Sequence, residues 1–213
     1  MRVIAVPVKG LARSKRRLSP VMSPLERGAL TLALLEDVLD ATTAVPGWES
    51  WVVSQDESVL EIAVRRGARP VTETKPTLSA ALRQVEREAT EQAASALAVL
   101  PADAGLVTAD ALASVLHTLG PVVASPSARG GTNLLLRRPP RAIPSRFGPE
   151  SMRRHVDAAA AKGLPAAVVE RPELAFDLDL PEDIPVLLAS AKNGRAREAC
   201  LQMDLPSRLS VGA

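Results

Sequence analysis

The stretch RVIAVPV at Arg2–Val8 decides the fold. After its first residue it is an unbroken run of β-branched and other apolar side chains. Such a run is typical of a strand that is buried on both faces, and strands of that kind belong to parallel sheets covered by helices. Proline lacks the amide hydrogen that a sheet needs, so we expect the pairing of this strand to end near Pro7.

A strong helix pattern follows at Ser23–Ala44, where leucine and valine recur at helical spacing. Ser23 is in place to cap the helix, Pro24 suits its first turn, and Glu26 completes a capping box. A buried strand followed by a long amphipathic helix is the first half of a βαβ unit.

The rest of the chain repeats this alternation. We predict strands at 50–54, 68–71, 95–103, 121–125, 132–136, 165–170 and 176–180, and helices at 57–66, 77–94, 108–119, 149–162 and 181–191. The succession predicts an α/β fold with three layers, in which a mostly parallel sheet is flanked by helices. Of the 213 residues, we assign 1–191 to a single domain and 192–213 to a C-terminal tail that is partly mobile.

Composition excludes several classes of function. Only 2% of the residues are aromatic and none is tyrosine, which argues against a binder of single-stranded nucleic acid, because such proteins stack bases on aromatic side chains. The single cysteine, Cys200, cannot form an internal disulfide, and no segment reads as a signal peptide or a membrane span. We therefore expect a cytoplasmic protein with small-molecule substrates, no nucleic-acid partner and no membrane.

Positive charge is concentrated in two places, although the formal net charge is only +2. The loop after the first strand carries Lys9, Arg13, Lys15 and Arg17, where it could grip a triphosphate. It contains neither the Gly-x-Gly-x-x-Gly fingerprint nor the Walker sequence, so charge would do most of the holding. A second arginine-rich stretch lies between residues 129 and 154, and either cluster could instead be an ordinary solvated face.

Three aspartates follow predicted strands or end them. Asp103 ends the run AVLPAD, and Asp177 and Asp179 alternate with apolar residues in AFDLDLPEDI at Ala175–Ile184. Ligands of open α/β sheets bind beyond the carboxyl ends of the strands, and carboxylates from separate strands are a usual way to hold Mg²⁺. We therefore predict a magnesium site made by the three aspartates. The alternative is that Asp177 or Asp179 caps the helix that starts at Pro181.

Two glycine-containing stretches are suited to an anion. The turn SARGGTN at Ser127–Asn133 can point backbone amides into a concavity, with the Thr132 hydroxyl as a further donor. RFGPES at Arg146–Ser151 opens a helix, whose N-terminus favours a phosphate or carboxylate. His155, one turn into that helix, is either structural or part of the anion site. Each stretch alone could be an ordinary turn or helix start, but together they indicate a phosphorylated acid.

The order and spacing of these motifs resemble a known family. The fragments that carry the resemblance are PVKGLARSKRRLSP, PLERGALTLALLEDVL, LPAD, GGTN, RFGPESMRRH and FDLDLPEDI, between about Val3 and Leu188. They are similar to the 2-phospho-L-lactate/phosphoenolpyruvate guanylyltransferases of coenzyme F-420 biosynthesis. The resemblance implies a homodimeric nucleotidyltransferase with a GT-A-like, Rossmann-like fold. The implied reaction transfers GMP from GTP to a small phosphorylated three-carbon acid and releases pyrophosphate.

The resemblance also implies roles for individual residues. Matching motifs make Asp103 and Asp177 magnesium ligands and place Lys9, Lys15 and Arg17 along the triphosphate. The implied catalytic residues are Asp103, Asp177 and Lys15. The implied binding residues for the acceptor acid are Thr132, Gly148 and Ser151. The chain departs from the family pattern at two places. Family members commonly have Asp-Leu-Pro-Leu where this chain has Asp103-Ala104-Gly105-Leu106, and Leu-Asn where it has Leu78-Ser79. Ser79 thus stands at a nucleotide-binding position with a shorter side chain, which bears on guanine or ribose contacts.

Two other functions fit the same residues. A sugar-phosphate nucleotidyltransferase on this fold would use similar carboxylates, and the altered segment after Asp103 suggests a non-catalytic nucleotide-binding partner. No serine or cysteine lies beside a credible base, so hydrolysis through a covalent intermediate has no support. An ionised phosphate monoester needs no general base, and catalysis then consists of aligning two anions and neutralising their charge. The residues leave 2-phospholactate, phosphoenolpyruvate and 3-phosphoglycerate open as acceptors.

Overall fold

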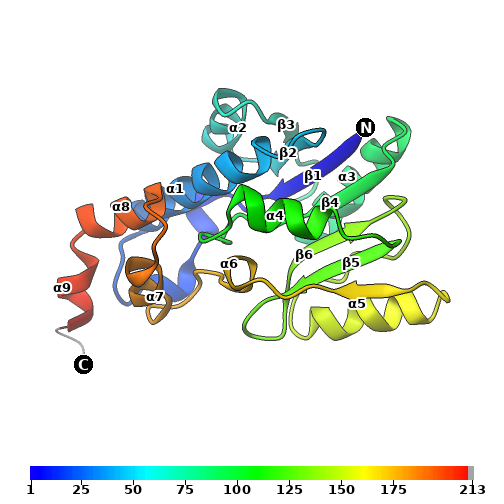
Figure 1. Cartoon of the computed structure of the whole chain (residues 1–213). Coiled ribbons are helices and arrows are strands. Elements are labelled where there is room, and N and C mark those ends of the chain that lie inside the picture. The colour runs from blue at the N-terminus through cyan, green and yellow to red at the C-terminus, as the bar shows by residue number, and fades with distance from the viewer. Residues whose placement is uncertain (211–213) are drawn as a thin grey trace.

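The computed structural model describes residues 1–210 of the chain. Within them, one sheet has the strand order β3-β2-β1-β4-β6-β5-β7 (Figure 1). Its strands are β1 (Arg2–Pro7), β2 (Glu49–Ser54), β3 (Arg69–Thr72), β4 (Ala96–Val99), β5 (Val122–Pro126), β6 (Thr132–Arg137) and β7 (Ala166–Val168). Neighbouring strands are parallel except at β6, which runs antiparallel to β4 and β5.

Helices cover both faces of this sheet. One face carries α1 (Pro24–Thr43), α2 (Glu57–Arg65) and α4 (Ala109–Leu116), and the opposite face carries α3 (Leu78–Glu91) and α5 (Ser151–Ala160). In β1, Ile4 and Val6 pack in the first of these layers, whereas Val3 and Ala5 pack in the second, and all four side chains are fully buried. The predicted α/β fold with three layers is confirmed.

The start of α1 has the predicted capping box. Ser23 Oγ accepts a hydrogen bond from the Glu26 amide at 3.3 Å, and Glu26 Oε2 accepts one from the Ser23 amide at 2.7 Å. Thr77 and Thr108 cap α3 and α4 without a reciprocal partner: each hydroxyl accepts from one backbone amide at 3.2 Å. These local bonds satisfy amides that have no partner inside the helix, so they fix where the helices begin.

The strand predicted at 176–180 is wrong. This segment has no strand partner, and it follows a short helix, α6 (Pro172–Ala175). It crosses the carboxyl ends of the central strands, where the Leu178 amide donates to the Asp103 carbonyl at 3.2 Å. Leu178 is fully buried against Leu30 and Leu34 of α1. The alternation of apolar and acidic residues therefore comes from a crossing segment with one buried side, and not from a sheet.

The C-terminal part of the described chain is helical. It forms α7 (Asp183–Ala189), α8 (Arg195–Gln202) and α9 (Leu205–Ser210). Ala196 and Cys200 of α8 are fully buried beside α1. Asp37 of α1 accepts hydrogen bonds from the Arg195 and Ala196 amides at 2.8 and 2.9 Å, so it caps α8 from another helix.

This packing bears on the predicted tail at 192–213. Ala196, Cys200 and Leu205 from this stretch are buried in the cluster that covers the flank of α1, while residues 211–213 lie outside the described part. The division of the chain at residue 191 stays a prediction. Among residues 1–210, no helix has both the length and the apolar character to cross a bilayer.

Candidate active site

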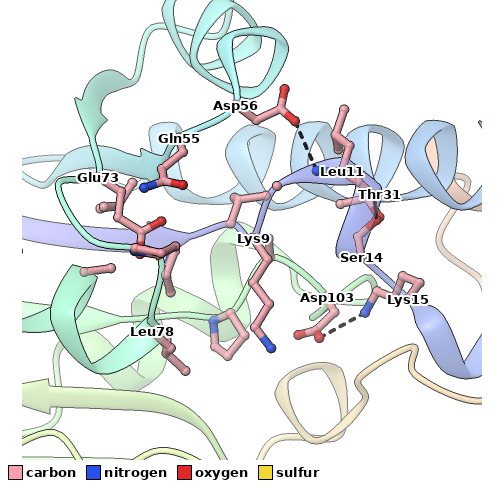
Figure 2. A pocket seen from close by; sticks show the side chains of 18 of the residues that line it. Lys9, Leu11, Ser14, Lys15, Thr31, Gln55, Asp56, Glu73, Leu78 and Asp103 are labelled. Carbon is pink, nitrogen blue, oxygen red and sulfur yellow. Dashed lines mark hydrogen bonds and ion pairs between the residues drawn. The ribbon is translucent and has the colours of Figure 1, made fainter.

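The main cavity lies at the carboxyl ends of the parallel strands and has a volume of about 980 Å³ (Figure 2). Its lining comes largely from the residues that directly follow β1, β2, β3 and β4. This is the edge of the sheet at which open α/β folds bind ligands. Five of the predicted site residues line it, namely Lys9, Lys15, Arg17, Asp103 and Asp179.

Lys15 is held at the centre of this site. It lies between two short 3₁₀ turns, Leu11–Arg13 and Arg16–Leu18, with its backbone in the left-handed region at φ 47°. Its side chain is only 7% exposed, and Nζ lies 3.0 Å from Asp103 Oδ2 and 2.5 Å from the Leu178 carbonyl oxygen. A left-handed backbone is costly for lysine, so the surrounding contacts must impose it.

Asp177 lies beside this group with one oxygen unpaired. Arg129 Nη1 donates to Asp177 Oδ2 at 3.3 Å, whereas Asp177 Oδ1 is buried and has no hydrogen-bond partner. Burial, and after it the charge of Asp103, raises the pKa of Asp177 above its usual value. The two carboxylates are thus close enough to repel one another, which is the situation that a bound cation would relieve.

These two carboxylates fit a magnesium ion that keeps other ligands. Within residues 1–210, no set of three or more acidic, histidine or cysteine side chains is arranged to hold a metal. Magnesium needs fewer protein ligands than that, because it binds through one or two carboxylates and takes waters and substrate phosphates in its other positions. The unpaired Asp177 Oδ1, together with Asp103, meets this requirement.

Asp179 is engaged differently from Asp177. Its Oδ2 accepts from Arg17 Nη1 at 3.0 Å, and its Oδ1 lies 3.9 Å from Lys15 Nζ. The capping alternative is not supported, because α7 has no side-chain cap at its start. Asp183 instead accepts from the amides of Asp179 and Leu180, both at 2.7 Å. Asp179 therefore holds the basic loop in place over the site.

The opposite end of the cavity is lined by polar and acidic side chains, with no lysine among the described residues there. Gln55 and Asp56 follow β2, and Glu73 follows β3. Figure 2 shows Gln55 and Glu73 at the end away from Asp103 and Lys15, while the Lys9 side chain extends toward the latter two. Asp56 Oδ2 is already bound to the Leu11 amide at 3.1 Å. Burial raises the pKa of Glu73 above its usual value.

The three residues assigned to the acceptor acid lie outside this lining. Thr132 and Ser151 are both buried, and Ser151 Oγ donates to Thr132 Oγ1 at 3.1 Å. Gly148, at φ +117°, makes the turn that leads into α5, a conformation that other residues rarely adopt. His155 joins this group through Thr132. Phe147 connects it to the cavity, because its ring lines the cavity and contacts the His155 ring edge-on at 5.2 Å.

The backbone amides of the glycine turn form hydrogen bonds within the turn itself. The Gly131 amide donates to Ser127 Oγ at 2.9 Å, and the Gly130 amide donates to the Ser127 carbonyl at 3.2 Å. These amides therefore do not point into a concavity, contrary to the sequence-based prediction. The turn contributes a side chain instead, since Arg129 reaches Asp177 and Asp183.

The second arginine-rich stretch does not converge on one anion site. Arg137 is fully buried and paired with Glu86 at 2.6 Å, and Arg138 donates to carbonyl oxygens at the end of α4. These two arginines are structural, whereas Arg129 faces the site. Ser79 is exposed on the first turn of α3 and does not line the cavity, although its neighbour Leu78 does.

The structure adds residues that the sequence analysis did not single out. They are Gln55, Asp56, Glu73, Arg129 and Phe147. A signal was available for the first three, because the rule about carboxyl ends of parallel strands applies to β2 and β3 as it does to β1.

Comparison with known proteins decides the family. The family model described as "Guanylyl transferase CofC like" matches residues 1–208. The chain belongs to this family. A phosphoenolpyruvate guanylyltransferase of Rubrobacter xylanophilus is 43% identical to it over 189 residues, which cover 87% of this chain and 92% of that protein. A 3-phospho-D-glycerate guanylyltransferase of Phenylobacterium zucineum is 39% identical over 209 residues, covering 94% and 95%.

Solved structures agree with the fold. One from Desulfovibrio desulfuricans G20, described as that of a nucleotide-diphospho-sugar transferase, superposes with a TM-score of 0.79 at 16% identity and covers 98% of this chain and 99% of its own. Membership of the CofC-like family makes the chain a nucleotidyltransferase, as the motifs predicted.

Proposed function

We propose that this protein transfers GMP from GTP to a small phosphorylated three-carbon acid, with Mg²⁺ as cofactor and pyrophosphate as the second product. The observation that carries the proposal is one cavity with two chemically different ends. Lys15, Asp103 and the unpaired oxygen of Asp177 lie at or beside one end, and Gln55 and Glu73 lie at the other. A nucleoside triphosphate likewise has two different ends: a negatively charged triphosphate and an uncharged base with hydrogen-bond donors and acceptors.

The phosphate end neutralises charge. Lys9, Lys15 and Arg17 supply three positive charges, and Asp103 and Asp177 would hold Mg²⁺. When bound, the ion would neutralise phosphate oxygens that the lysines do not reach. Lys15 is restrained by Asp103 and the Leu178 carbonyl, so its charge is in place before the substrates arrive. Preorganised charge of this kind is the main contribution that a protein makes to phosphoryl transfer.

The base end is suited to guanine. Guanine presents two donors on one edge, N1–H and the 2-amino group, and a carboxylate can accept both. Of the two carboxylates there, Asp56 holds the Leu11 amide of the basic loop, and Glu73, which has the Thr77 amide beside it, is the one that we assign to the base. Adenine has no such pair of donors, so Glu73 would favour GTP over ATP.

The acceptor binds as an anion and provides the nucleophile itself. Its phosphate is ionised at neutral pH, so an oxygen can attack the α-phosphorus without a general base. Thr132 and Ser151 offer hydroxyl groups, and the turn that precedes Thr132 carries Arg129, which is bound to Asp177. This connection supports placing the acceptor residues near the proposed magnesium ligands. The names of the relatives from R. xylanophilus and P. zucineum support phosphoenolpyruvate or 3-phosphoglycerate, and the family resemblance adds 2-phospholactate.

A competition assay tests this function. The purified protein is incubated with GTP, Mg²⁺ and an equimolar mixture of phosphoenolpyruvate, 2-phospho-L-lactate, 3-phosphoglycerate and several sugar phosphates, and the products are identified by mass. We expect pyrophosphate and one guanylylated three-carbon acid. A guanylylated sugar would indicate a sugar-phosphate enzyme, and GTP binding without any product would indicate a non-catalytic partner. The same proposal assigns the product to coenzyme F-420 biosynthesis and the protein to the cytoplasm. It also assigns the protein to a homodimer, and sedimentation of the purified chain would check that oligomeric state.

A further inference from the structure

The side chain of His155 is fully buried, and both of its ring nitrogens have defined partners. The Arg146 backbone amide donates to His155 Nε2 at 2.9 Å. His155 Nδ1 lies 3.0 Å from Thr132 Oγ1. A backbone amide can only donate, so Nε2 must carry a lone pair and no hydrogen. The ring is therefore neutral, and its one hydrogen is on Nδ1, where it points at the Thr132 hydroxyl.

The surroundings keep the ring in this form. Burial lowers the pKa of His155 to about 4, and the positive charges of Arg137, Arg154 and Arg146 act in the same direction. These arginines come from β6, from α5 and from the loop before α5, and the charge of each opposes protonation of the ring. The acidic groups of this layer are engaged elsewhere or exposed: Glu86 is paired with Arg137, Glu150 with Arg153, and Asp157 faces solvent. The hydrogen bond from the Arg146 amide thus fixes the tautomer of His155, and the nearby arginine charges disfavour a second proton on the ring.

The state of His155 determines the state of the next residue. Thr132 Oγ1 accepts one hydrogen bond from His155 Nδ1 and another from Ser151 Oγ. A hydroxyl oxygen has two lone pairs, so both are then used. The hydroxyl hydrogen of Thr132 is left to donate. Among the described residues its partner is the sulfur of Met152 at 3.9 Å, and a thioether is a weak acceptor.

We infer that His155 is a positioning residue that makes Thr132 an obligatory hydrogen-bond donor toward the acceptor acid. This rests on the proposed function, in which Thr132 contacts that acid. A threonine hydroxyl can normally either donate or accept. By filling both lone pairs, His155 and Ser151 remove the second choice, so the site binds a carboxylate or phosphate oxygen and disfavours a ligand that presents only donors. His155 itself touches no substrate and transfers no proton.

Two amide substitutions separate this role from a packing role. Asn places an amide nitrogen near the position of Nδ1, so His155→Asn can still donate to Thr132. Gln places its amide near the position of Nε2, so His155→Gln can still accept from Arg146 but gives Thr132 no donor. Thr132→Val removes the hydroxyl altogether. His117 is exposed at the end of α4, and the variant His117→Asn is the control for loss of an imidazole.

The expected result is a separation of the two Michaelis constants. A hydrogen bond to a charged group is worth enough that His155→Gln and Thr132→Val should raise the KM for phosphoenolpyruvate by about 10-fold or more. His155→Asn should stay within about 3-fold of wild type, and the KM for GTP should hardly move in any variant. If Asn and Gln raise the KM for the acid equally, or if both Michaelis constants rise together, the inference is overturned.

A second measurement does not need turnover or a variant that folds. Two-bond ¹H–¹⁵N correlation spectra of the ¹⁵N-histidine-labelled wild-type protein report which ring nitrogen carries the hydrogen. We expect His155 to show the Nδ1–H form without change between about pH 5.5 and 8. An Nε2–H form, or a doubly protonated ring in this range, would sink the inference. A wild-type protein that converts no phosphorylated acid would contradict the proposed function instead, and the spectra would still decide the tautomer.

Discussion

The ammonium group of Lys15 lies 3.0 Å from Oδ2 of Asp103, although the two residues are 88 positions apart in the chain. The backbone of Lys15 is left-handed where this contact is made. The same ammonium reaches the Leu178 carbonyl at 2.5 Å. One side chain thus ties the loop after β1 to the end of β4 and to the segment that crosses them. The positive charge is fixed where the phosphates of GTP are proposed to bind.

Replacing Lys15 should therefore remove turnover more than it removes nucleotide binding. For Lys15→Met we expect kcat to fall by about 10²-fold or more, because an aligned charge that acts on the reacting phosphate is lost. Pyrophosphate release and GTP binding measured on the same preparation check this. Arg83→Met, at an exposed position on α3, is the matched control. A variant that keeps kcat but binds GTP poorly would show that Lys15 only anchors the nucleotide.

Asp177→Asn tests the proposed magnesium ligand. Asparagine keeps the shape of the side chain and loses its charge, so the variant should fold normally and lose turnover by about 10²-fold or more. The Mg²⁺ concentration that gives half-maximal activity should rise as well. Asp110→Asn, at an exposed position in the first turn of α4, should change neither quantity. Normal magnesium dependence in Asp177→Asn would remove this residue from the metal site.

Glu73 is expected to select the base. ITP lacks the 2-amino group of GTP, so a carboxylate that binds both donors of guanine should prefer GTP in kcat/KM by about 10-fold. Glu73→Ala should lose this preference, because neither base then finds its acceptor. Glu57→Ala, at an exposed position at the start of α2, should keep it. If the ratio of GTP to ITP in Glu73→Ala equals that of wild type, the base is recognised elsewhere.

The buried imidazole of His155 predicts a pH dependence of stability. Its pKa falls from 6.5 to about 4 on folding. Between these values the unfolded chain binds a proton that the folded protein does not, so the free energy of unfolding falls as the pH falls through this window and is fully restored above pH 6.5. The loss from this one group by pH 4 is about 3 kcal/mol.

Denaturant unfolding of wild type and His155→Asn at several pH values checks this. The other titrating groups are common to both proteins, so the difference between their two curves isolates His155. We expect the free energy of unfolding of wild type to fall relative to that of His155→Asn as the pH drops from 6.5 to 4, and the difference to be constant above pH 6.5. Parallel curves over the whole range would mean that the folded protein protonates the ring at its ordinary pKa.

Local sequence patterns were sufficient for most of the fold. The apolar run at Arg2–Pro7 and the capping box of Ser23 and Glu26 are determined by neighbouring residues, and both were predicted. The segment at 176–180 was not, because alternation reports which side of a chain is buried but not what buries it. Here the partner of Leu178 is α1, and not a neighbouring strand. α8 was missed because its cap comes from Asp37, 158 residues away from the Arg195 amide.

The site shows the same limit. Strand ends indicated Asp103 and the basic loop, since parallel strands share one carboxyl edge. Charge alone could not separate Arg129, which faces Asp177, from Arg137, which is buried beside Glu86. The hydrogen-bond direction at Thr132 depends on the Arg146 amide that approaches His155 through space. That contact is a product of tertiary packing, so no spacing rule contains it.

The cap that Asp37 provides to α8 joins the first long helix to a segment that is synthesised much later. During synthesis α1 emerges well before α8, so the part of its surface that Ala196 and Cys200 cover is bare until the last helices are made. A truncation before Arg195 would keep Leu178 over Leu30 and Leu34 but would leave the rest of this apolar cluster open, which favours aggregation.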